Sequence, residues 1–419
     1  MDEVEFDNVP MSYKYLLEAL WHKTFTLTST ENREFLFGEK EMTSSELSSF
    51  YSRMNMIKDK LNSIKSQIHS LVSKGNALDR WRSFTSFTHP MRHLPRQLLL
   101  KYEKGKESLL CTQAYCKFLQ MVTAYPELIN PKAFSIRNEE HCDSYKTLRS
   151  FHLCEAPGAF VLALKVLTKI LLKGLIVFFK TNIALSRTYG YTFGLENEQK
   201  DDSSSPHENK TYIEFDKHFL SNDNDRMVFG PDGSGDILTF TNEYLQKLVS
   251  MYGKFHVITA DAGIDCTDEP IIQEKKMRPL IEKQLEVAFE CLCIGGNFLI
   301  KIFTFFESET ILLLARICFA FEQVKCLKPP SSKPGNSEIY LLCLNFMGQP
   351  GTITFSRFFT QQIEECAHFF TNHQVRFIQF NLHTFRRLSR SERANLEFQK
   401  CTVQEVMADF LYHKILVNS

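Results

Sequence analysis

The sequence predicts an α/β fold, a doubly wound sheet with helices on both faces, flanked by helical N- and C-terminal regions. Five short runs are apolar along their whole length, as strands covered on both faces should be. Stretches with helical spacing separate these runs, which is the order expected of parallel strands joined by crossover helices. The five predicted strands are Ser150–Cys154, Leu175–Phe179, Phe255–Ala260, Asn297–Phe303 and Ile339–Leu344.

The chain of 419 residues divides into three predicted regions. Residues 1–106 should form a helical N-terminal region, 107–350 the α/β domain, and 351–419 a helical extension. From Ser44 to Lys74, apolar side chains recur with nearly heptad spacing among polar ones, which predicts one long amphipathic helix. We favour a helix that packs within this chain, and a platform for a partner or for RNA is the alternative.

Charge and cysteine usage narrow the class of protein. The formal net charge is zero, so any nucleic-acid contact must come from local patches. One candidate is Trp81–Lys106, where cations alternate with aromatic side chains, although an ordinary solvated surface explains it equally well. The twelve cysteines include no Cys-x-x-Cys pair and the start of the chain is acidic, so we expect a reduced nuclear and cytoplasmic protein without a metal site.

Two further stretches bear on the class of protein. The longest apolar run, Phe160–Phe179, contains Lys165, Lys169 and Lys173 at every fourth position. One face of that helix should therefore be exposed to solvent, and we do not expect the helix to span or contact a membrane. Glu196–Lys210 is rich in Asp, Ser, Asn and Glu and should be a surface loop.

The clearest local signal is the turn that follows the first predicted strand. Here Phe151–Cys154 ends in Glu155-Ala156-Pro157-Gly158, and Ala159-Phe160 opens a helix. In an open α/β sheet, ligands bind at the carboxyl ends of strands beside such turns, where glycine allows close backbone approach. The pattern lacks the Gly-x-Gly-x-x-Gly spacing of dinucleotide sites, which disfavours a dehydrogenase.

This turn resembles the cofactor motif of the FtsJ-like ribose 2′-O-methyltransferases, and most closely that of the cap-specific members that make cap 2. Further resemblances follow in the order of that family's motifs. They are the helix around Lys117, the adenine segment around Asp236, the aspartate motif at Asp261, the strand with Lys301, and the glutamate motif at Glu338. Several matches in the correct order are far more specific than any one of them.

The resemblance implies a Rossmann-like fold, S-adenosyl-L-methionine as cofactor, and a catalytic Lys-Asp-Lys-Glu tetrad. The implied tetrad is Lys117, Asp261, Lys301 and Glu338, and the implied cofactor contacts are Glu155, Ala156, Pro157, Gly158, Ala159, Phe160 and Asp236. Lys301 would withdraw the proton of the 2′-hydroxyl, which requires a lowered pKa; Lys117 and the sulfonium, as like charges, would lower it. Asp261 and Glu338 would hold the two ammonium groups in place.

The expected activity is methylation of the ribose of the second transcribed nucleotide of capped mRNA. The alternatives are a ribose methyltransferase for cap 1, rRNA or tRNA, and an inactive RNA-binding protein on the same fold. Larger family members carry a second methyltransferase-like domain, and whether a protein partner replaces it here is left open. The segment Lys180–Leu185 lacks the acidic residue that many methyltransferases use for the cofactor ribose, and aromatic anchors for the cap are expected in Trp81–Tyr102 or Tyr189–Phe193.

Overall fold

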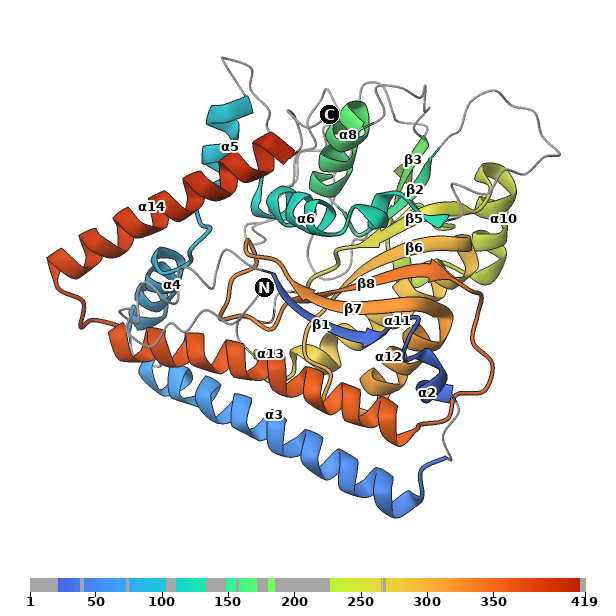
Figure 1. Cartoon of the computed structure of the whole chain (residues 1–419), viewed down its shortest axis with the longest axis horizontal. Helices are drawn as coiled ribbons and strands as arrows, with labels where there is room; N and C mark the ends of the chain where they lie inside the picture. Colours follow the sequence, from blue (N-terminus) through green and yellow to red (C-terminus); the bar gives the residue numbers. More distant parts are fainter. Residues whose placement is uncertain are drawn as a thin grey trace, which may run out of the picture.

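The computed structural model describes residues 22–37, 41–72, 75–102, 111–132, 148–155, 158–171, 180–184, 227–264, 266 and 269–414. Within these ranges the centre of the molecule is one eight-stranded sheet in the order β1-β7-β8-β6-β5-β2-β3-β4 (Figure 1). Strands β6, β5, β2, β3 and β4 pair in parallel, while β8 is antiparallel to its neighbours β6 and β7, and β1 is antiparallel to β7. The parallel block confirms the predicted α/β fold.

The strands are short at one edge of the sheet and longer toward the other. Their bounds are β1 Lys23–Thr28, β2 Arg149–Leu153, β3 Lys180–Ala184, β4 Met227–Val228, β5 Phe255–Ala260, β6 Leu292–Ile302, β7 Phe321–Lys328 and β8 Ile339–Phe346. The helices are α2 Arg33–Phe37, α3 Ser44–Val72, α4 Ala77–Phe87, α5 Leu94–Tyr102, α6 Gln113–Ala124, α8 Ala159–Leu171, α10 Asn242–Tyr252, α11 Gln273–Cys291, α12 Ser308–Ala320, α13 Arg357–Thr384 and α14 Arg390–Tyr412, with 3₁₀ turns η1 Pro126–Ile129 and η3 Ile237–Thr239.

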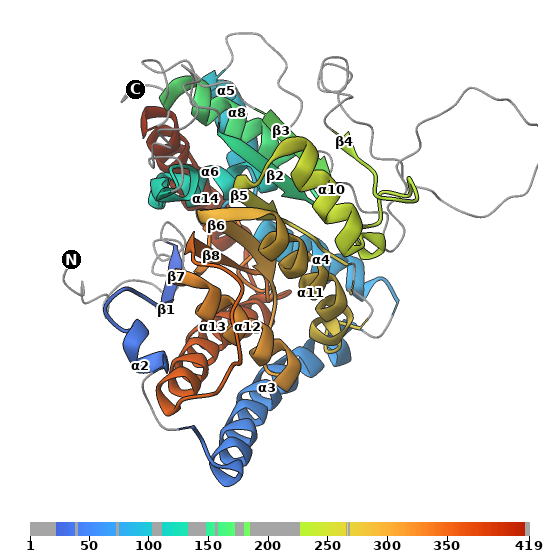
Figure 2. The ribbon, with the colours of Figure 1, turned by 90° about the vertical axis from the view of Figure 1, so that its right-hand side faces the viewer.

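Successive residues of the central strands face two different apolar cores, because side chains alternate across a sheet. In β6, Phe298 and Ile300 pack in the core shared with α10, α11, α12 and α13, whereas Leu299 packs in the core shared with α5, α6, α8 and α14. Figure 2 shows α10 and α11 on one side of the sheet and α6, α8 and α14 on the other. The helices of the C-terminal extension therefore contribute to both cores.

Several strands differ from the prediction. The expected second strand, residues 175–179, lies outside the described residues, and the strand beside β2 is Lys180–Ala184. Strands β1, β4 and β7 were not expected. In β1 polar and apolar residues alternate and in β7 they are mixed, which are weaker signals than a continuous apolar run, and β4 has only two residues. Because β1 falls within residues 1–106, that region is not entirely helical.

Helix α3 confirms the predicted amphipathic helix and its favoured interpretation. Its apolar stripe, which includes Met54, Ile57, Leu61 and Ile64, is buried, and the helix packs against α13. Figure 1 shows the two helices lying side by side below the sheet. The stripe is thus covered within this chain and is not a free platform for a partner or for RNA.

Helix α8 accounts for the first part of the long apolar run. Its residues Ala163, Leu164 and Leu167 are buried against the sheet core. Among the helices that the structure describes, none is long and apolar enough to cross a membrane. The predicted loop Glu196–Lys210 lies outside the described residues.

The aromatic residues proposed as cap anchors are only partly available. Trp81 and Phe84 of α4 are buried, and each packs edge-on against Phe385 with ring centroids 5.3 Å apart. The expectation that these two rings present free faces is therefore wrong, because the end of α13 covers them. The other candidate segment, Tyr189–Phe193, lies outside the described residues.

If α3 is a packing helix, Leu61→Ala should lower the free energy of unfolding by about 2–5 kcal/mol, because a buried leucine leaves a cavity. Leu61 is 1% exposed, whereas Met56 on the same helix is 70% exposed. The control Met56→Ala should therefore stay within about 0.5 kcal/mol of the parent. Denaturant unfolding followed by circular dichroism measures both, and equal losses would contradict the packing role.

Candidate active site

Several predicted site residues lie at one edge of the sheet. Parallel strands end at the same edge, so residues just after β2 and β5 and near the end of β6 come together there. Glu155 lies two residues after β2, Asp261 directly after β5 and Lys301 one residue before the end of β6, whereas Asp236 lies eight residues beyond β4. The topology alone therefore assembles predicted residues that are far apart in sequence.

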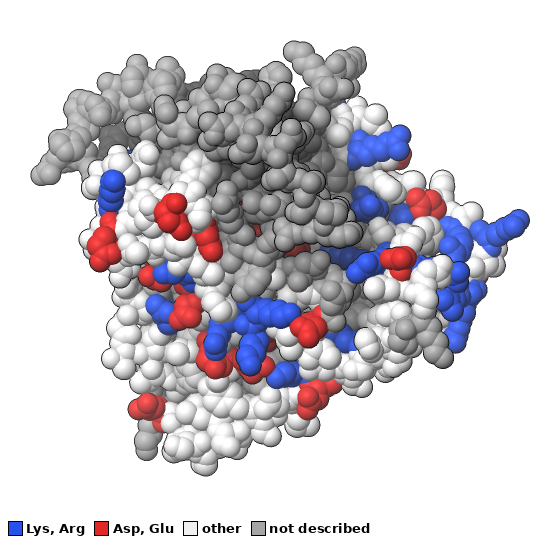
Figure 3. Space-filling model, turned by 180° about the vertical axis from the view of Figure 1, so that it is seen from behind, with Lys and Arg blue, Asp and Glu red and all other residues white. Residues whose placement is uncertain are grey.

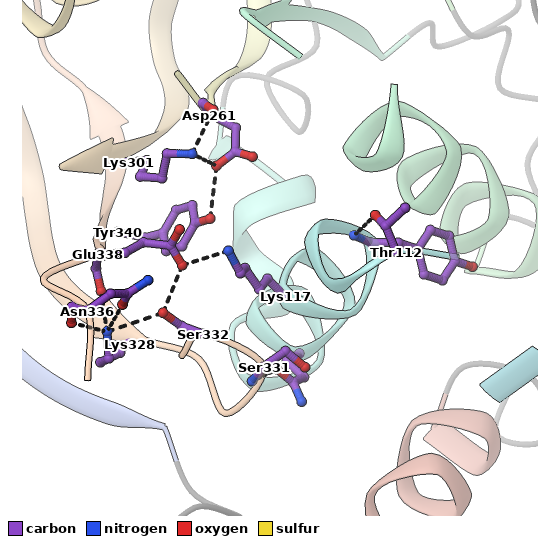
Figure 4. Close-up of polar contacts among 12 residues, drawn as sticks. Thr112, Lys117, Asp261, Lys301, Lys328, Ser331, Ser332, Asn336, Glu338 and Tyr340 are labelled. Carbon is purple, nitrogen blue, oxygen red and sulfur yellow. Dashed lines mark hydrogen bonds and ion pairs between the residues drawn. The ribbon is translucent and has the colours of Figure 1, made fainter. Parts of the chain in front are cut away.

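The four residues of the predicted tetrad form two short ion pairs. Lys117 Nζ lies 2.6 Å from Glu338 Oε1, and Lys301 Nζ lies 3.1 Å from Asp261 Oδ1. Lys301 also donates a hydrogen bond of 2.9 Å to the Asp261 carbonyl oxygen. Figure 4 shows the four side chains pointing toward a common space. The structure thus brings together all four predicted tetrad residues.

Each lysine is positioned by the pattern of its own element. Thr112 caps the N-terminus of α6 by accepting a hydrogen bond from the Tyr115 N–H, and Lys117 lies in the second turn of that helix. In β6, Lys301 alternates with Ile300 and Ile302 and so faces the α6 side of the sheet. Both ammonium groups therefore approach the space between β6 and α6.

Burial and charge set the protonation of this cluster. Burial alone would raise the pKa of Glu338, but the charges of Lys117, Lys301 and Lys328 lower it to about 2. For Lys301, burial acts to lower the pKa, yet the charges of Asp261 and Glu338 outweigh it and raise the pKa above its usual value. Without the sulfonium, two carboxylates outweigh the second lysine, and the lowering of the Lys301 pKa by bound cofactor stays a prediction.

Tyr340 was missed by sequence reasoning and connects the two ion pairs. Its hydroxyl donates a 2.8 Å hydrogen bond to Asp261 Oδ1, and its ring lies 5.9 Å from Lys117 Nζ. Tyr340 is the antiparallel partner of Lys301 in the sheet, so its position is fixed by strand register. A tyrosine within an otherwise apolar strand is the signal that could have revealed it.

Lys328 at the end of β7 was also missed. Its buried ammonium donates to Asn336 Oδ1 at 2.8 Å, to the Glu338 carbonyl at 2.7 Å and to Ser332 Oγ at 3.2 Å. Ser332 in turn donates a 2.7 Å hydrogen bond to Glu338 Oε1. Burial, followed by the charge of Lys117, lowers the pKa of Lys328 to about 7. This network holds the segment before β8 so that Glu338 faces Lys117.

Glu155 lies in a second part of the site, beside Asp261. Its Oε1 accepts a 2.7 Å hydrogen bond from the Phe160 N–H, while its buried Oε2 has no hydrogen-bond partner in the part of the chain that the structure describes. Burial, and then the charge of Asp261, raise the pKa of Glu155 well above its usual value. A buried acceptor without a donor, next to a second carboxylate, fits a cationic ligand.

The other predicted cofactor contacts are less informative. Gly158 has a φ of 102°, which favours glycine, and Ala159 and Phe160 are buried at the start of α8. The Phe160 ring packs 4.8 Å from that of Phe118 and so presents no free surface. Asp236 accepts a hydrogen bond from the Leu238 N–H as the cap of η3. Ala156 and Pro157 lie outside the described residues, as do the residues after β3 where a contact to the cofactor ribose was sought.

Comparison with known proteins identifies relatives of this chain. The family profile described as FtsJ-like methyltransferase matches residues 112–346. The cap-specific mRNA (nucleoside-2′-O-)-methyltransferase 2 of Mus musculus is 30% identical over 363 residues, which cover 80% of this chain and 43% of that protein. The protein of the same name from Danio rerio is 28% identical over 374 residues, covering 81% of this chain and 44% of that protein.

A viral relative matches a shorter stretch. The cap-specific mRNA (nucleoside-2′-O-)-methyltransferase of Autographa californica nuclear polyhedrosis virus is 35% identical over 123 residues, which are 29% of this chain and 47% of that protein. The chain therefore spans less than half of the length of these three relatives. Because the family profile matches more than half of the chain, including all four tetrad residues, this chain belongs to the FtsJ-like methyltransferase family.

Proposed function

We propose that this protein transfers the methyl group of S-adenosylmethionine to the ribose 2′-hydroxyl of the second transcribed nucleotide of capped mRNA. The observation that carries the proposal is the cluster of Lys117, Asp261, Lys301 and Glu338 at the carboxyl edge of the sheet. The Mus musculus and Danio rerio relatives, whose matches cover about four fifths of this chain, are both named for cap-specific 2′-O-methylation.

The residues around Glu155 fit the proposed cofactor. S-Adenosylmethionine, when bound, supplies an electrophilic methyl group on a positively charged sulfur, and its methionine part carries an ammonium group. Oε2 of Glu155, which has no hydrogen-bond partner among the described residues, is a suitable acceptor for that ammonium, and the nearby charge of Asp261 favours a cation there. The backbone at Gly158 allows close approach beside it.

The tetrad provides the groups that a ribose hydroxyl requires. In the free protein Lys301 is an ammonium ion, which can hold and orient a 2′-oxygen by donating to it. Its role in removing the proton requires that its pKa fall when positive charge enters the site. Lys117, held by Glu338 at 2.6 Å, adds a second positive charge that stabilises a developing oxyanion. Asp261 keeps the Lys301 side chain in place.

An inactive RNA-binding protein on the same fold is a weaker alternative. Buried ion pairs rarely stabilise a protein more than apolar residues of the same volume would. A protein without the chemistry would therefore have no reason to keep four charged residues in this cluster. Ribose methylation of cap 1, rRNA or tRNA uses the same chemistry, and only the position of the methylated nucleotide separates these activities from cap 2 formation.

The first test concerns the cofactor. Glu155→Gln should weaken the binding of S-adenosylmethionine by roughly ten- to a hundredfold, because a hydrogen bond between charged groups is lost. Wild-type affinity should rise with pH as Glu155 loses its proton, since its pKa in the free protein is raised and the bound cation favours the carboxylate. The glutamine variant should lose this pH dependence, as measured by calorimetry.

A control is available within the same experiment. Because burial raises the pKa of Glu155 well above its usual value and so favours a neutral side chain there, glutamine, a neutral group of similar shape, should change the melting temperature without ligand little. Wild-type protein whose melting temperature did not rise with S-adenosylmethionine concentration would count against the proposed cofactor.

The second test separates chemistry from binding. Lys301→Ala should lower kcat by about 10² or more while cofactor and RNA affinity stay near wild type. Lys301→Arg should be almost as damaging, because arginine does not release its proton. The matched control is Lys283→Arg on α11, a partly buried lysine paired with Glu286 outside the tetrad, which should keep full activity. Near-normal kcat in Lys301→Arg would show that the lysine only orients the oxygen.

The third test concerns the substrate. Capped RNA should be methylated at its second nucleotide, and the same RNA with a 5′ triphosphate should react much more slowly, because phosphate contacts alone cannot define a distance from the 5′ end. The comparison needs moderate salt, since low salt strengthens nonspecific phosphate binding. Mapping the labelled methyl group gives the answer. Equal rates on both RNAs, or methylation of internal riboses, would refute the cap 2 assignment while retaining ribose methylation.

A further inference from the structure

A hollow of about 730 Å³ lies where α4 meets the turn between α13 and α14. Three exposed arginines line it: Arg80 from α4, Arg386 from the turn and Arg393 from α14. Figure 3, which views the molecule from behind, shows Lys and Arg side chains gathered on the side where these elements lie. The tetrad and the proposed cofactor site do not include any of these residues. We call this feature the arginine hollow.

Aromatic rings hold two of these arginines in place. The guanidinium of Arg386 lies 4.9 Å from the centre of the Phe385 ring. That of Arg393 lies 6.0 Å from the Phe84 ring and 5.8 Å from the Phe87 ring. A guanidinium that is already ordered on a ring loses less conformational entropy when it binds an anion. The arginine hollow is thus preorganised to bind a negatively charged ligand.

The positive charge of the arginine hollow is largely uncompensated. Across the ranges that the structure describes, none of its three arginines makes an ion pair. The one acid that lines the hollow, Asp79, already lies 3.7 Å from Arg82. On α14, the carboxylate of Glu392 accepts hydrogen bonds from Ser389 in a capping box. An anionic ligand would therefore meet an excess of positive charge.

Helix α4 connects the arginine hollow to the tetrad. Thr85 of α4 accepts a 2.8 Å hydrogen bond from the ammonium of Lys333, which lies in the segment that leads to Glu338. At about 1.5 Å per residue, the 11 residues of α4 span roughly 16 Å. A single-stranded RNA of a few nucleotides covers such a distance.

Further cations line this connection around His89, just beyond the end of α4. Burial lowers the pKa of His89 to about 3, and the charges of four neighbours contribute: Lys333, Lys117, Arg92 and Lys400. One of these neighbours is the tetrad lysine itself, so the C-terminal end of α4 lies near the tetrad.

We propose that the arginine hollow binds the phosphodiester backbone of the RNA substrate beyond the target nucleotide. This inference rests on the proposed function, which supplies the RNA. Arginine is well suited to phosphate because its planar group donates two parallel hydrogen bonds. The triphosphate that joins the cap to the RNA is also anionic, so the length of the RNA, and not charge, separates the capped end from the strand beyond the target. The ligand chemistry that fits is phosphate, and the backbone beyond the target nucleotide is the source that we propose.

The test replaces all three arginines by glutamine in the full chain. The affinity for a capped RNA long enough to reach the arginine hollow should fall at least tenfold. The slope of log Kd against log salt should decrease by about 2, because each lost phosphate contact to a single strand removes about 0.7. A matched control replaces Lys247, Lys254 and Arg376, which are exposed on other parts of the molecule, by glutamine. The control should leave both quantities unchanged, as read by fluorescence anisotropy.

RNA length distinguishes the strand from the cap. In the parent, kcat/KM should be higher for the long capped RNA than for a capped oligonucleotide that ends just after the target, and the arginine variant should lose this advantage. Equal losses on both RNAs, or unchanged affinity for the long RNA, would overturn the proposal. A parent that methylates no RNA would refute the proposed function instead, while the binding measurements would still judge the arginine hollow.

Discussion

The ion pair between Lys117 and Glu338 is the interaction on which the architecture of the site depends. Both side chains are largely shielded from water, and a buried charge without a partner costs several kcal/mol. At 2.6 Å the pair joins α6 to the segment that precedes β8. A second contact, between the Gln120 side chain and the Ser331 N–H at 2.9 Å, fixes the same helix to the same segment. Helix, segment and sheet must keep their relative positions for these charges to stay paired.

The surrounding polar network is organised around this constraint. Lys328 ties the segment before β8 together through its three donors, and Tyr340 ties Asp261 to the central strands. Such buried polar groups are stabilising only when each is satisfied. They specify one geometry for the tetrad. Apolar residues of the same volume would give equal or greater stability, because charged groups lose hydration when they are buried. The network is therefore better explained by the positioning of reactive groups than by stability.

The sequence predicts some features well, for identifiable physical reasons. The range Phe255–Ala260 was predicted as a strand and is β5, because a central parallel strand is apolar on both faces. The tetrad was predicted from the resemblance of several motifs, in the correct order, to those of the FtsJ-like family. Strands β1 and β7 were not predicted, because their mixture of polar and apolar residues resembles a surface segment. Trp81 looked available for stacking, and only the tertiary packing of Phe385 shows that it is covered.

Protonation states could not be predicted from the sequence, for a related reason. Lys301 lies close in space to both Asp261 and Glu338, and its pKa follows from those distances rather than from its neighbours in the chain. In the same way, the raised pKa of Glu155 comes from its burial and from Asp261. Motif order can supply the identities of charged residues, but the sign of each shift requires the structure.

On the proposed function, a chain with no net charge would have to attract RNA through local charge. The tetrad contains two positive and two negative groups, so it adds no field that reaches far into solvent at physiological salt. Attraction for a polyanion must then come from a local excess such as the arginine hollow, which acts at short range and without reading sequence. On the proposed function, two separate contacts would act on one strand. Binding of the 5′ end would determine which nucleotide is the target. The arginine hollow would keep the strand extended along α4, so that the ribose of that nucleotide reaches Lys301.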